Sequence, residues 1–170
     1  TAGPPVTAYI SSLVPGRVAL NEWAMFTIVF DGSQSGNDRL KIYQNGGATN
    51  IITSYSGTTP ATLPNTTDDF FIGRGYNGYF NGQISNFAIW DYVLNNDDRI
   101  NLYNNGVPQD LNNFRIQPVN WWPLNENSSY YGGADWITRD VKSGQDGDGN
   151  NIGNIDDLVG NAPGSTGNGT

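Results

Sequence analysis

Apolar and polar residues alternate along several short stretches of the chain, a pattern typical of β-strands. The longest of these stretches, EWAMFTIVFDGS, has apolar side chains on both faces, because Met25 and Val29 alternate with Phe26 and Ile28. We therefore expect a central strand here, with Trp23 in the core.

Further strands are predicted where short apolar runs are bounded by turn residues. The Asn45-Gly46 pair predicts a tight hairpin that joins residues 40–44 to residues 48–57. Other predicted strands lie at residues 8–13, 70–75, 114–116 and 119–126.

The strand pattern breaks once between Phe80 and Leu94. Apolar residues fall at Ile84, Phe87 and Ile89, so the strict period of two is interrupted by one residue. One extra residue in a strand is the mark of a β-bulge, and we predict the bulge at Ser85–Asn86.

One short surface helix is predicted after Leu94. Asn95 or Asn96 can cap its first turn, and Asp97 and Asp98 follow where the helix dipole favours anions. The apolar residues Ile100 and Tyr103 are expected on one face, before Gly106 ends the helix. The chain as a whole is thus expected to be all-β with one short helix.

Composition restricts the possible partners. The chain has 170 residues, 36% hydrophobic and only 14% charged, with a net charge of −8. This acidic balance opposes binding to nucleic acid or to an anionic membrane surface. Insertion into a membrane is not expected either, because no stretch approaches the ~20 apolar residues of a membrane span. The sequence contains no histidine and no cysteine, which excludes Ser–His and Cys–His catalysis from this chain alone.

Three segments together resemble the laminin-G-like, concanavalin A-like lectin/glucanase jelly-roll superfamily. The first is NEWAMFTIVFDGSQSGNDRLKIYQNGG, the second runs from FFIGRG to NNDDRINLYNNG, and the third is VNWWPLNENSS with the later DVKSGQDG. The resemblance implies a two-sheet antiparallel jelly-roll sandwich, with one domain over residues 1–160 and a disordered tail at residues 161–170.

The order of these segments differs from the family's order, because the third segment opens the domain in the family and comes last here. Two interpretations stay open. The chain is a circularly permuted domain, or residues 1–107 are the second half of one domain and residues 118–160 the start of another. The family's buried acidic position on the bulged strand corresponds to Asn86, which keeps a polar group there without the charge.

Oxygen-bearing side chains recur near the C-terminus at the spacing of a calcium loop. They occupy positions 1, 3, 5, 9 and 12 of a twelve-residue segment that begins at Asp146. The alternative is a flexible linker rich in Asp, Gly and Asn. A second calcium candidate pairs Asp31 with Asp38, where a turn is the favoured reading. The candidate ligands of the first site are Asp146, Asp148, Asn150, Asn154, Asp156 and Asp157.

Aromatic and amide side chains in loops suggest carbohydrate binding, since flat rings stack on pyranose rings and amides bond to hydroxyl pairs. Trp23 and Trp90 are expected in the core instead, and at most one of Trp121 and Trp122 is expected to be exposed. The candidate sugar-binding residues are Arg74, Tyr76, Asn77, Tyr79, Tyr130, Tyr131 and Trp136.

The sequence thus favours a non-catalytic carbohydrate-binding or adhesion module of a larger extracellular or virion-surface protein. Its partner would be a glycan or a cell-surface receptor. The competing class is a structural or assembly module that packs on neighbouring subunits. A glycoside hydrolase remnant would need Glu126 with Asp135 or Asp140 as its two carboxylates.

Overall fold

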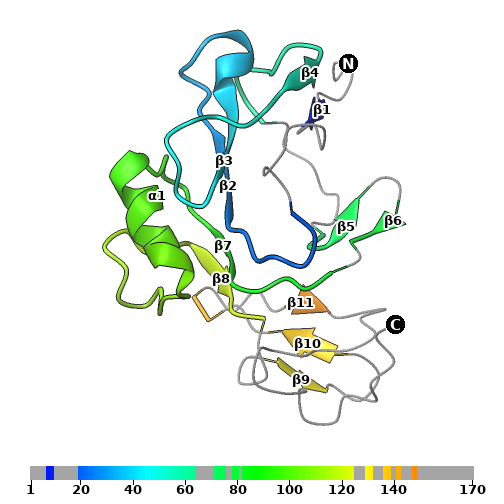
Figure 1. Ribbon diagram of the computed structural model, residues 1–170, viewed down its shortest axis with the longest axis vertical. Coiled ribbons are helices and arrows are strands. Elements are labelled where there is room, and N and C mark those ends of the chain that lie inside the picture. The colour runs from blue at the N-terminus through cyan, green and yellow to red at the C-terminus, as the bar shows by residue number, and fades with distance from the viewer. Residues whose placement is uncertain are drawn as a thin grey trace. The chain divides into compact units, whose positions relative to one another are not determined.

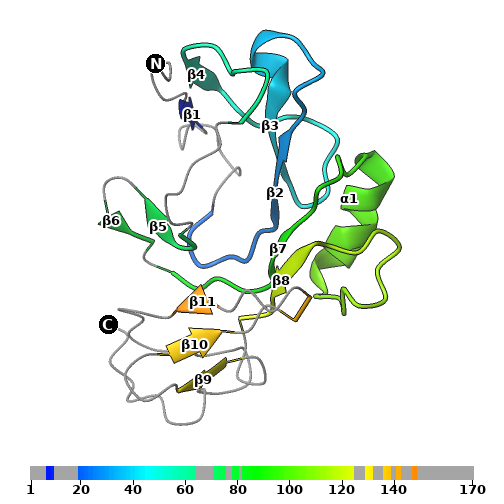
Figure 2. The same cartoon turned by 180° about the vertical axis from the view of Figure 1, so that it is seen from behind.

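The computed structural model describes residues 7–9, 19–63, 71–75, 78–80, 82–124, 129–131, 136–138, 141–142 and 147–148. Figure 1 shows these parts as a set of short strands with one α-helix, and Figure 2 shows them from behind. The elements in chain order are β1 (Thr7–Tyr9), β2 (Phe26–Phe30), η1 (Gly36–Arg39), β3 (Leu40–Gln44), β4 (Ser54–Ser56), β5 (Arg74–Gly75), β6 (Gly78–Tyr79), β7 (Phe87–Ile89), α1 (Asn96–Tyr103), η2 (Asn104–Gly106), β8 (Asn120–Trp122), β9 (Ser129–Tyr131), β10 (Trp136–Thr138) and β11 (Gly147–Asp148).

Every strand pairing among the described residues is antiparallel. The strands form small sheets, with β9, β10 and β11 in a sheet of three and the others in pairs. The expectation of a β-rich chain with one short α-helix is therefore confirmed in these parts of the chain.

The chain divides into two compact units. The first contains Thr1–Asp68 and Tyr92–Asp110, and the second contains Asp69–Asp91 and Leu111–Thr170. The chain therefore enters each unit twice.

The Asn45-Gly46 turn does not connect two paired strands, so the hairpin predicted there is wrong. β3 pairs with the preceding strand β2, and β4 pairs with β1. The turn itself is present, because both residues have left-handed φ angles of 51° and 70°. Beyond it, the chain returns beside β3 through one backbone hydrogen bond, from Ile51 N–H to Ile42 O at 2.8 Å, and forms no strand there.

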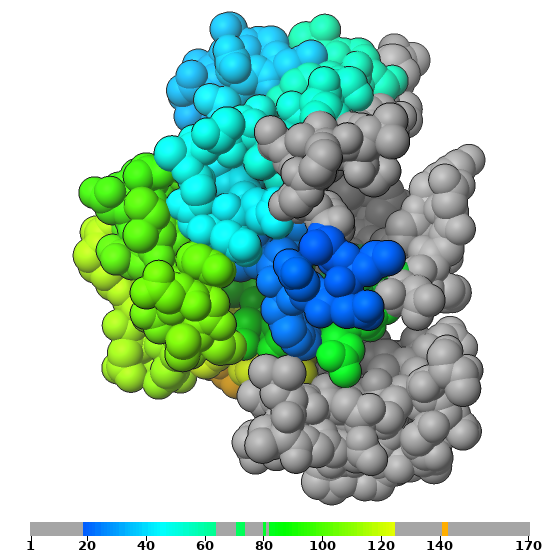
Figure 3. All heavy atoms as spheres, in the orientation of Figure 1, coloured from blue at the N-terminus to red at the C-terminus, as the bar shows by residue number. Residues whose placement is uncertain are grey.

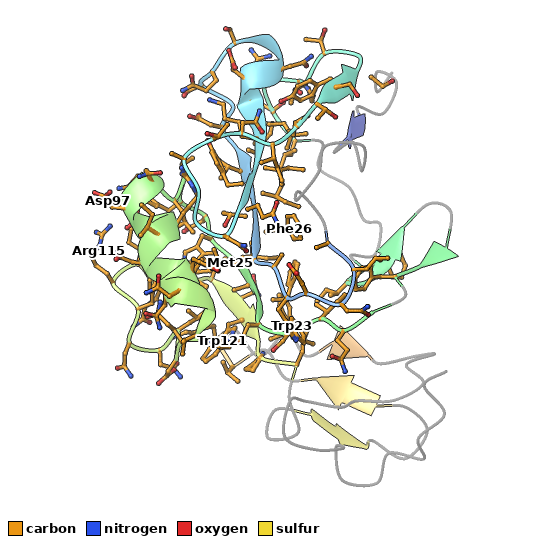
Figure 4. The ribbon with its side chains drawn as sticks, viewed as in Figure 1. Trp23, Met25, Phe26, Asp97, Arg115 and Trp121 are labelled. Atoms are coloured by element: carbon orange, nitrogen blue, oxygen red, sulfur yellow. The ribbon has the colours of Figure 1, made fainter. Side chains whose placement is uncertain are left out.

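The strand β2 is shorter than predicted and is not buried on both faces. Thr27 and Val29 are buried, whereas Phe26 is 42% exposed and Ile28 is 69% exposed. The space-filling view shows the segment that begins at residue 19, in blue, on the visible face (Figure 3). Trp23, labelled in Figure 4, precedes β2 and is 53% exposed, so the prediction that it lies in the core is wrong. The period of two sets which residues share a face, but it cannot show which face is covered.

Helix α1 begins where the sequence predicts. The Asn95 side chain accepts a hydrogen bond from Asp98 N–H at 3.0 Å, and the Asp98 carboxylate accepts one from Asn95 N–H at 3.2 Å. These two bonds form a capping box, which satisfies two backbone donors that the helix would otherwise leave free. The helix ends at Tyr103 with Asn104 in the left-handed conformation, and Gly106 ends the following 3₁₀ turn instead.

The buried residues of α1 are charged rather than apolar. Ile100 is 50% exposed, so the predicted apolar face is wrong for this residue, while Asp98 is 1% exposed and Arg99 is 6% exposed. The Arg99 guanidinium lies 3.7 Å from the centre of the Tyr43 ring and donates to Leu94 O at 2.8 Å. The helix therefore packs on the β2–β3 pair through a cation–π contact.

The strand β8 carries the aromatic core of the second unit. Trp121 and Trp122 are both buried, and Trp122 pairs in register with Phe87 of β7, with their ring centres 5.9 Å apart. Trp90 is half-buried and packs edge-on against Phe114. Residues 114–116, predicted as a strand, form bends instead, although Phe114 is buried.

No helix in the described ranges is both long enough and apolar enough to cross a membrane.

Candidate functional site

The hairpin β5–β6 carries two of the predicted sugar-binding residues. Arg74 pairs with Tyr79, and Gly75 pairs with Gly78, so the two strands are joined by a two-residue turn. Tyr76 and Asn77 come between the two strands in the sequence and lie outside the described residues. The structure thus places Arg74 and Tyr79 opposite each other at the base of one short hairpin (Figure 1).

Two exposed phenylalanines flank this hairpin. Phe71 precedes β5 and is 50% exposed, and Phe80 follows β6 and is 60% exposed. A backbone hydrogen bond from Phe80 N–H to Gly73 O, at 2.7 Å, extends the hairpin by one rung beyond the Arg74–Tyr79 pair. An exposed apolar patch, unlike a single exposed side chain, marks an interaction site, and both of these rings lie next to the paired strands β5 and β6.

Glycines allow the side chains near the hairpin to approach its backbone closely. A Cβ at Gly82 would lie 2.6 Å from Cε1 of Phe80, and a Cβ at Gly73 would lie 3.1 Å from Cδ1 of Ile84. Gly73 also has a φ of 78°, a conformation that other residues rarely adopt. The Phe80 ring therefore lies against the backbone at Gly82 while more than half of the residue stays open to solvent.

The other predicted aromatic residues lie in a second hairpin of the same unit. Tyr130 and Tyr131 are in β9, and Trp136 is in β10, where its register partner is Tyr131. Residues 132–135, which connect the two strands, are outside the described ranges. All seven predicted sugar-binding residues thus belong to the second unit, five of them to paired strands.

Sequence reasoning missed the two exposed phenylalanines as candidates. Phe71 was assigned to a predicted strand at residues 70–75, but the strand starts only at Arg74 and leaves Phe71 outside it. The sequence pattern groups Phe80 with the Gly, Tyr and Asn residues of the predicted turn. For Phe80 the available clue was Gly82, which lies against its ring, because glycine often marks a close approach to the backbone.

The predicted calcium segment lies mostly outside the described residues. Asp148 is in β11, where it pairs with Ile137 of β10. Among the residues that the structure describes, no three His, Cys, Asp or Glu side chains gather where they could hold a metal ion. The candidates outside the described residues are Asp146, Asn150, Asn154, Asp156 and Asp157.

The Asp31 carboxylate, the second calcium candidate, is engaged by its own turn. It accepts hydrogen bonds from the Ser33 hydroxyl at 2.6 Å, from Ser33 N–H at 3.0 Å and from the Gln34 side chain at 2.9 Å. These donors, the Ser33 hydroxyl first, hold the pKa of Asp31 below its ordinary value of 3.8. Asp38 lies in the adjacent 3₁₀ helix η1. The arrangement matches the turn reading.

Asn86 has a structural role at the predicted bulge. Its φ of 53° is left-handed, and β7 begins only at the next residue. The side-chain oxygen accepts a hydrogen bond from Trp121 Nε1 at 3.3 Å, and its N–H donates to Pro123 O at 3.0 Å. Ser85 and Asn86 precede β7 and lie in no strand, so the predicted bulge within a strand is wrong; the polar side chain of Asn86 instead holds β8 through Trp121.

The carboxylates considered for glycoside hydrolysis, Glu126, Asp135 and Asp140, lie outside the described residues.

Comparison with known families gives one match. A family model described as the concanavalin A-like lectin/glucanases superfamily matches residues 5–98, which is more than half of the chain. The search of curated proteins and the search of solved structures found no match. The matched segment includes β2, β3 and the β5–β6 hairpin with both of its flanking phenylalanines.

Proposed function

Because the chain belongs to the concanavalin A-like lectin/glucanases superfamily, we propose that it is a non-catalytic carbohydrate-binding or adhesion module. The observation that carries this proposal is the exposure of Phe71 and Phe80 on either side of the β5–β6 hairpin. The family alone does not fix the function, since this superfamily also includes glucanases.

The chemistry of the hairpin suits a sugar. A pyranose ring presents apolar C–H groups on its faces and hydroxyl groups around its edge. An exposed phenylalanine can cover a face, and Arg74 and Tyr79 carry groups that hydrogen-bond to hydroxyls.

The whole molecule would be a two-sheet jelly-roll sandwich that forms part of a larger extracellular or virion-surface protein. In this proposal its partner is a glycan, either free or on a cell-surface receptor. The acidic charge of the chain favours neutral or basic ligands over phosphate-bearing ones. Calcium would be held by the segment that begins at Asp146 and would stabilise the second unit.

A second candidate function, assembly with neighbouring subunits, is favoured by one observation in the first unit. Phe26 and Ile28 lie on one face of β2, pair in register with Gln44 and Ile42, and are 42% and 69% exposed. An apolar sheet face that is open to solvent is the expected feature of a structural module that packs on another subunit.

A glycan array probed with the intact chain separates these two functions. A carbohydrate-binding module should bind a restricted set of related glycans. An assembly module should bind none of them and should instead self-associate or bind its parent protein, as measured by sedimentation over a range of concentrations. Binding to no glycan would overturn the leading proposal.

Removal of calcium tests the metal separately. If the segment at Asp146 holds calcium, a saturating chelator should lower the melting temperature, because the ion binds only the folded state. The matched control is a variant with Asp156→Asn and Asp157→Asn. Its melting temperature should be lower than that of the unmodified protein and should not change when chelator is added. An unchanged melting temperature in the unmodified protein would rule out a stabilising calcium ion.

A further inference from the structure

Two Asn-Gly pairs in the described part of the chain have very different surroundings. The sequence contains five such pairs, and both residues are described for Asn45-Gly46 and Asn105-Gly106. An asparagine before glycine is chemically reactive, because the glycine N–H has no neighbouring side chain to hinder its attack on the asparagine side chain. Folded structure then decides whether the reaction can occur.

The Asn45-Gly46 pair is fixed by hydrogen bonds to Met25 and by its contact with helix α1. The side-chain oxygen of Asn45 accepts a hydrogen bond from Met25 N–H at 2.9 Å, and its own N–H donates to Met25 O at 2.9 Å. Gly46 is buried under helix α1, because a Cβ at Gly46 would lie 2.9 Å from Arg99 O. The backbone at this pair cannot rotate unless the contact with α1 opens.

The pair at Asn105 lies on the surface after α1. Both residues are exposed, and Asn105 has a left-handed φ of 55°. The local restraints are the bond from Val107 N–H to Asn104 O, at 3.1 Å, and the exposed bond from the Asn104 side chain to Val107 O, at 3.2 Å. Opening this one turn therefore frees the peptide bond, without loss of any buried contact of α1 described above.

We propose that Asn105 is a spontaneous deamidation site of the folded protein, while Asn45, with the same two-residue sequence, is protected. The backbone nitrogen of Gly106 attacks Cγ of Asn105, a new C–N bond forms, and the side-chain nitrogen leaves as ammonia. Water then opens the five-membered succinimide ring at one of its two carbonyl groups. The product is aspartate or isoaspartate at position 105.

The modification changes the charge at the end of α1. It places a new carboxylate just beyond the helix C-terminus, where the backbone dipole already carries partial negative charge. Arg99, the one basic residue of α1, does not compensate this charge, because it lies before the last turn of the helix. The isoaspartate product also adds one carbon to the main chain within the 3₁₀ turn η2. Both effects should loosen the end of the helix.

Peptide mapping tests the proposal on the intact chain. Trypsin cuts after lysine and arginine, so Asn45 and Asn105 fall in separate peptides, residues 42–74 and 100–115. After incubation of the folded protein at mildly alkaline pH, fragment masses should show deamidation at Asn105 on the order of tenfold faster than at Asn45. In urea the two deamidation rates should become similar. Unfolding removes the structural difference between the sites, and both have the same Asn-Gly sequence.

Two outcomes would overturn the inference. One is an equal or faster reaction at Asn45 in the folded state. The other is a variant, Asn105→Gln, that still gains the mass of one deamidation in the peptide at residues 100–115 at the original rate. This second result would place the reaction on another asparagine of that peptide. Circular dichroism of the variant in the same buffer confirms that the comparison concerns folded protein.

Discussion

Helix α1 and the β5–β6 hairpin depart from the usual rule of burial in opposite directions. The helix buries Asp98 and Arg99, whereas the hairpin leaves Phe71 and Phe80 largely exposed on its two sides. A buried charged side chain is uncommon and therefore informative, and the two exposed rings both add apolar surface next to one short hairpin. The first arrangement holds a structural element in place, and the second leaves apolar surface available to a ligand.

The difference follows from what each side chain contacts. Arg99 stacks on Tyr43 and donates to Leu94 O, so its charge is compensated by a ring and by a backbone carbonyl. The Phe80 ring, in contrast, lies against the backbone at Gly82, just beyond the hairpin, and the residue is 60% exposed. Removal of the first side chain should therefore reduce stability, and removal of the second should reduce binding.

The largest expected effect on stability is that of Arg99→Ala. This change uncovers the Tyr43 ring and leaves the buried Leu94 carbonyl without its donor. The free energy of unfolding, measured by urea denaturation, should fall by about 2–4 kcal/mol. The matched control is Arg115→Ala at an exposed position, where the change should stay within about 0.5 kcal/mol. Similar losses from both variants would contradict the role given to Arg99.

A smaller effect is expected from Asn95→Ala. The substitution removes the side-chain acceptor for Asp98 N–H and so breaks one half of the capping box. The expected loss is about 1 kcal/mol of unfolding free energy. Asn95→Ser keeps a capping oxygen and should restore most of that loss. If serine were as damaging as alanine, the loss would have to arise from something other than the cap.

The smallest effect concerns Asp31 in its exposed turn. Hydrogen bonds from Ser33 and Gln34 hold the pKa of Asp31 below 3.8 in the folded state. The unfolded chain therefore takes up the proton at a higher pH than the folded chain. The stabilisation is present above pH 3.8 and is lost as the pH falls through the lower folded pKa.

The variant Ser33→Ala tests this contribution directly. Loss of the hydroxyl donor should move the pKa of Asp31 upward toward 3.8, as followed by NMR titration of the carboxyl carbon. Acid unfolding of this variant should then begin at slightly higher pH. An unchanged titration curve would show that the hydroxyl does not hold the carboxylate in solution.

Local features of the fold were predictable from the sequence because they depend on neighbouring residues. The capping residue Asn95 and the strand with Trp121 and Trp122 were both predicted within a few residues. Each depends on chemistry that a short window of sequence contains. The superfamily was also predictable, because the first resembling segment and most of the second lie within the matched residues 5–98.

Long-range features were not predictable in the same way. The Asn45-Gly46 pair correctly predicted a turn, but it did not predict which strands pair. The strand β3 pairs with β2, which precedes it, and not with the segment after the turn. The burial of Arg99 could not be seen either, since it depends on Tyr43, which lies far away in the sequence. For the candidate site, the hairpin residues were predicted, but the exposure of Phe71 and Phe80 depends on which surfaces other segments cover.

The central claim is that the exposed aromatic rings beside the β5–β6 hairpin bind a glycan. The most direct test is the affinity of the intact chain for its best glycan from an array, compared with that of a double variant, Phe71→Ala with Phe80→Ala. The account predicts a loss of about tenfold or more in affinity with the melting temperature nearly unchanged, and no loss in the control Phe26→Ala, whose ring lies in the other unit. Equal affinity of the double variant and the unmodified chain would contradict the claim.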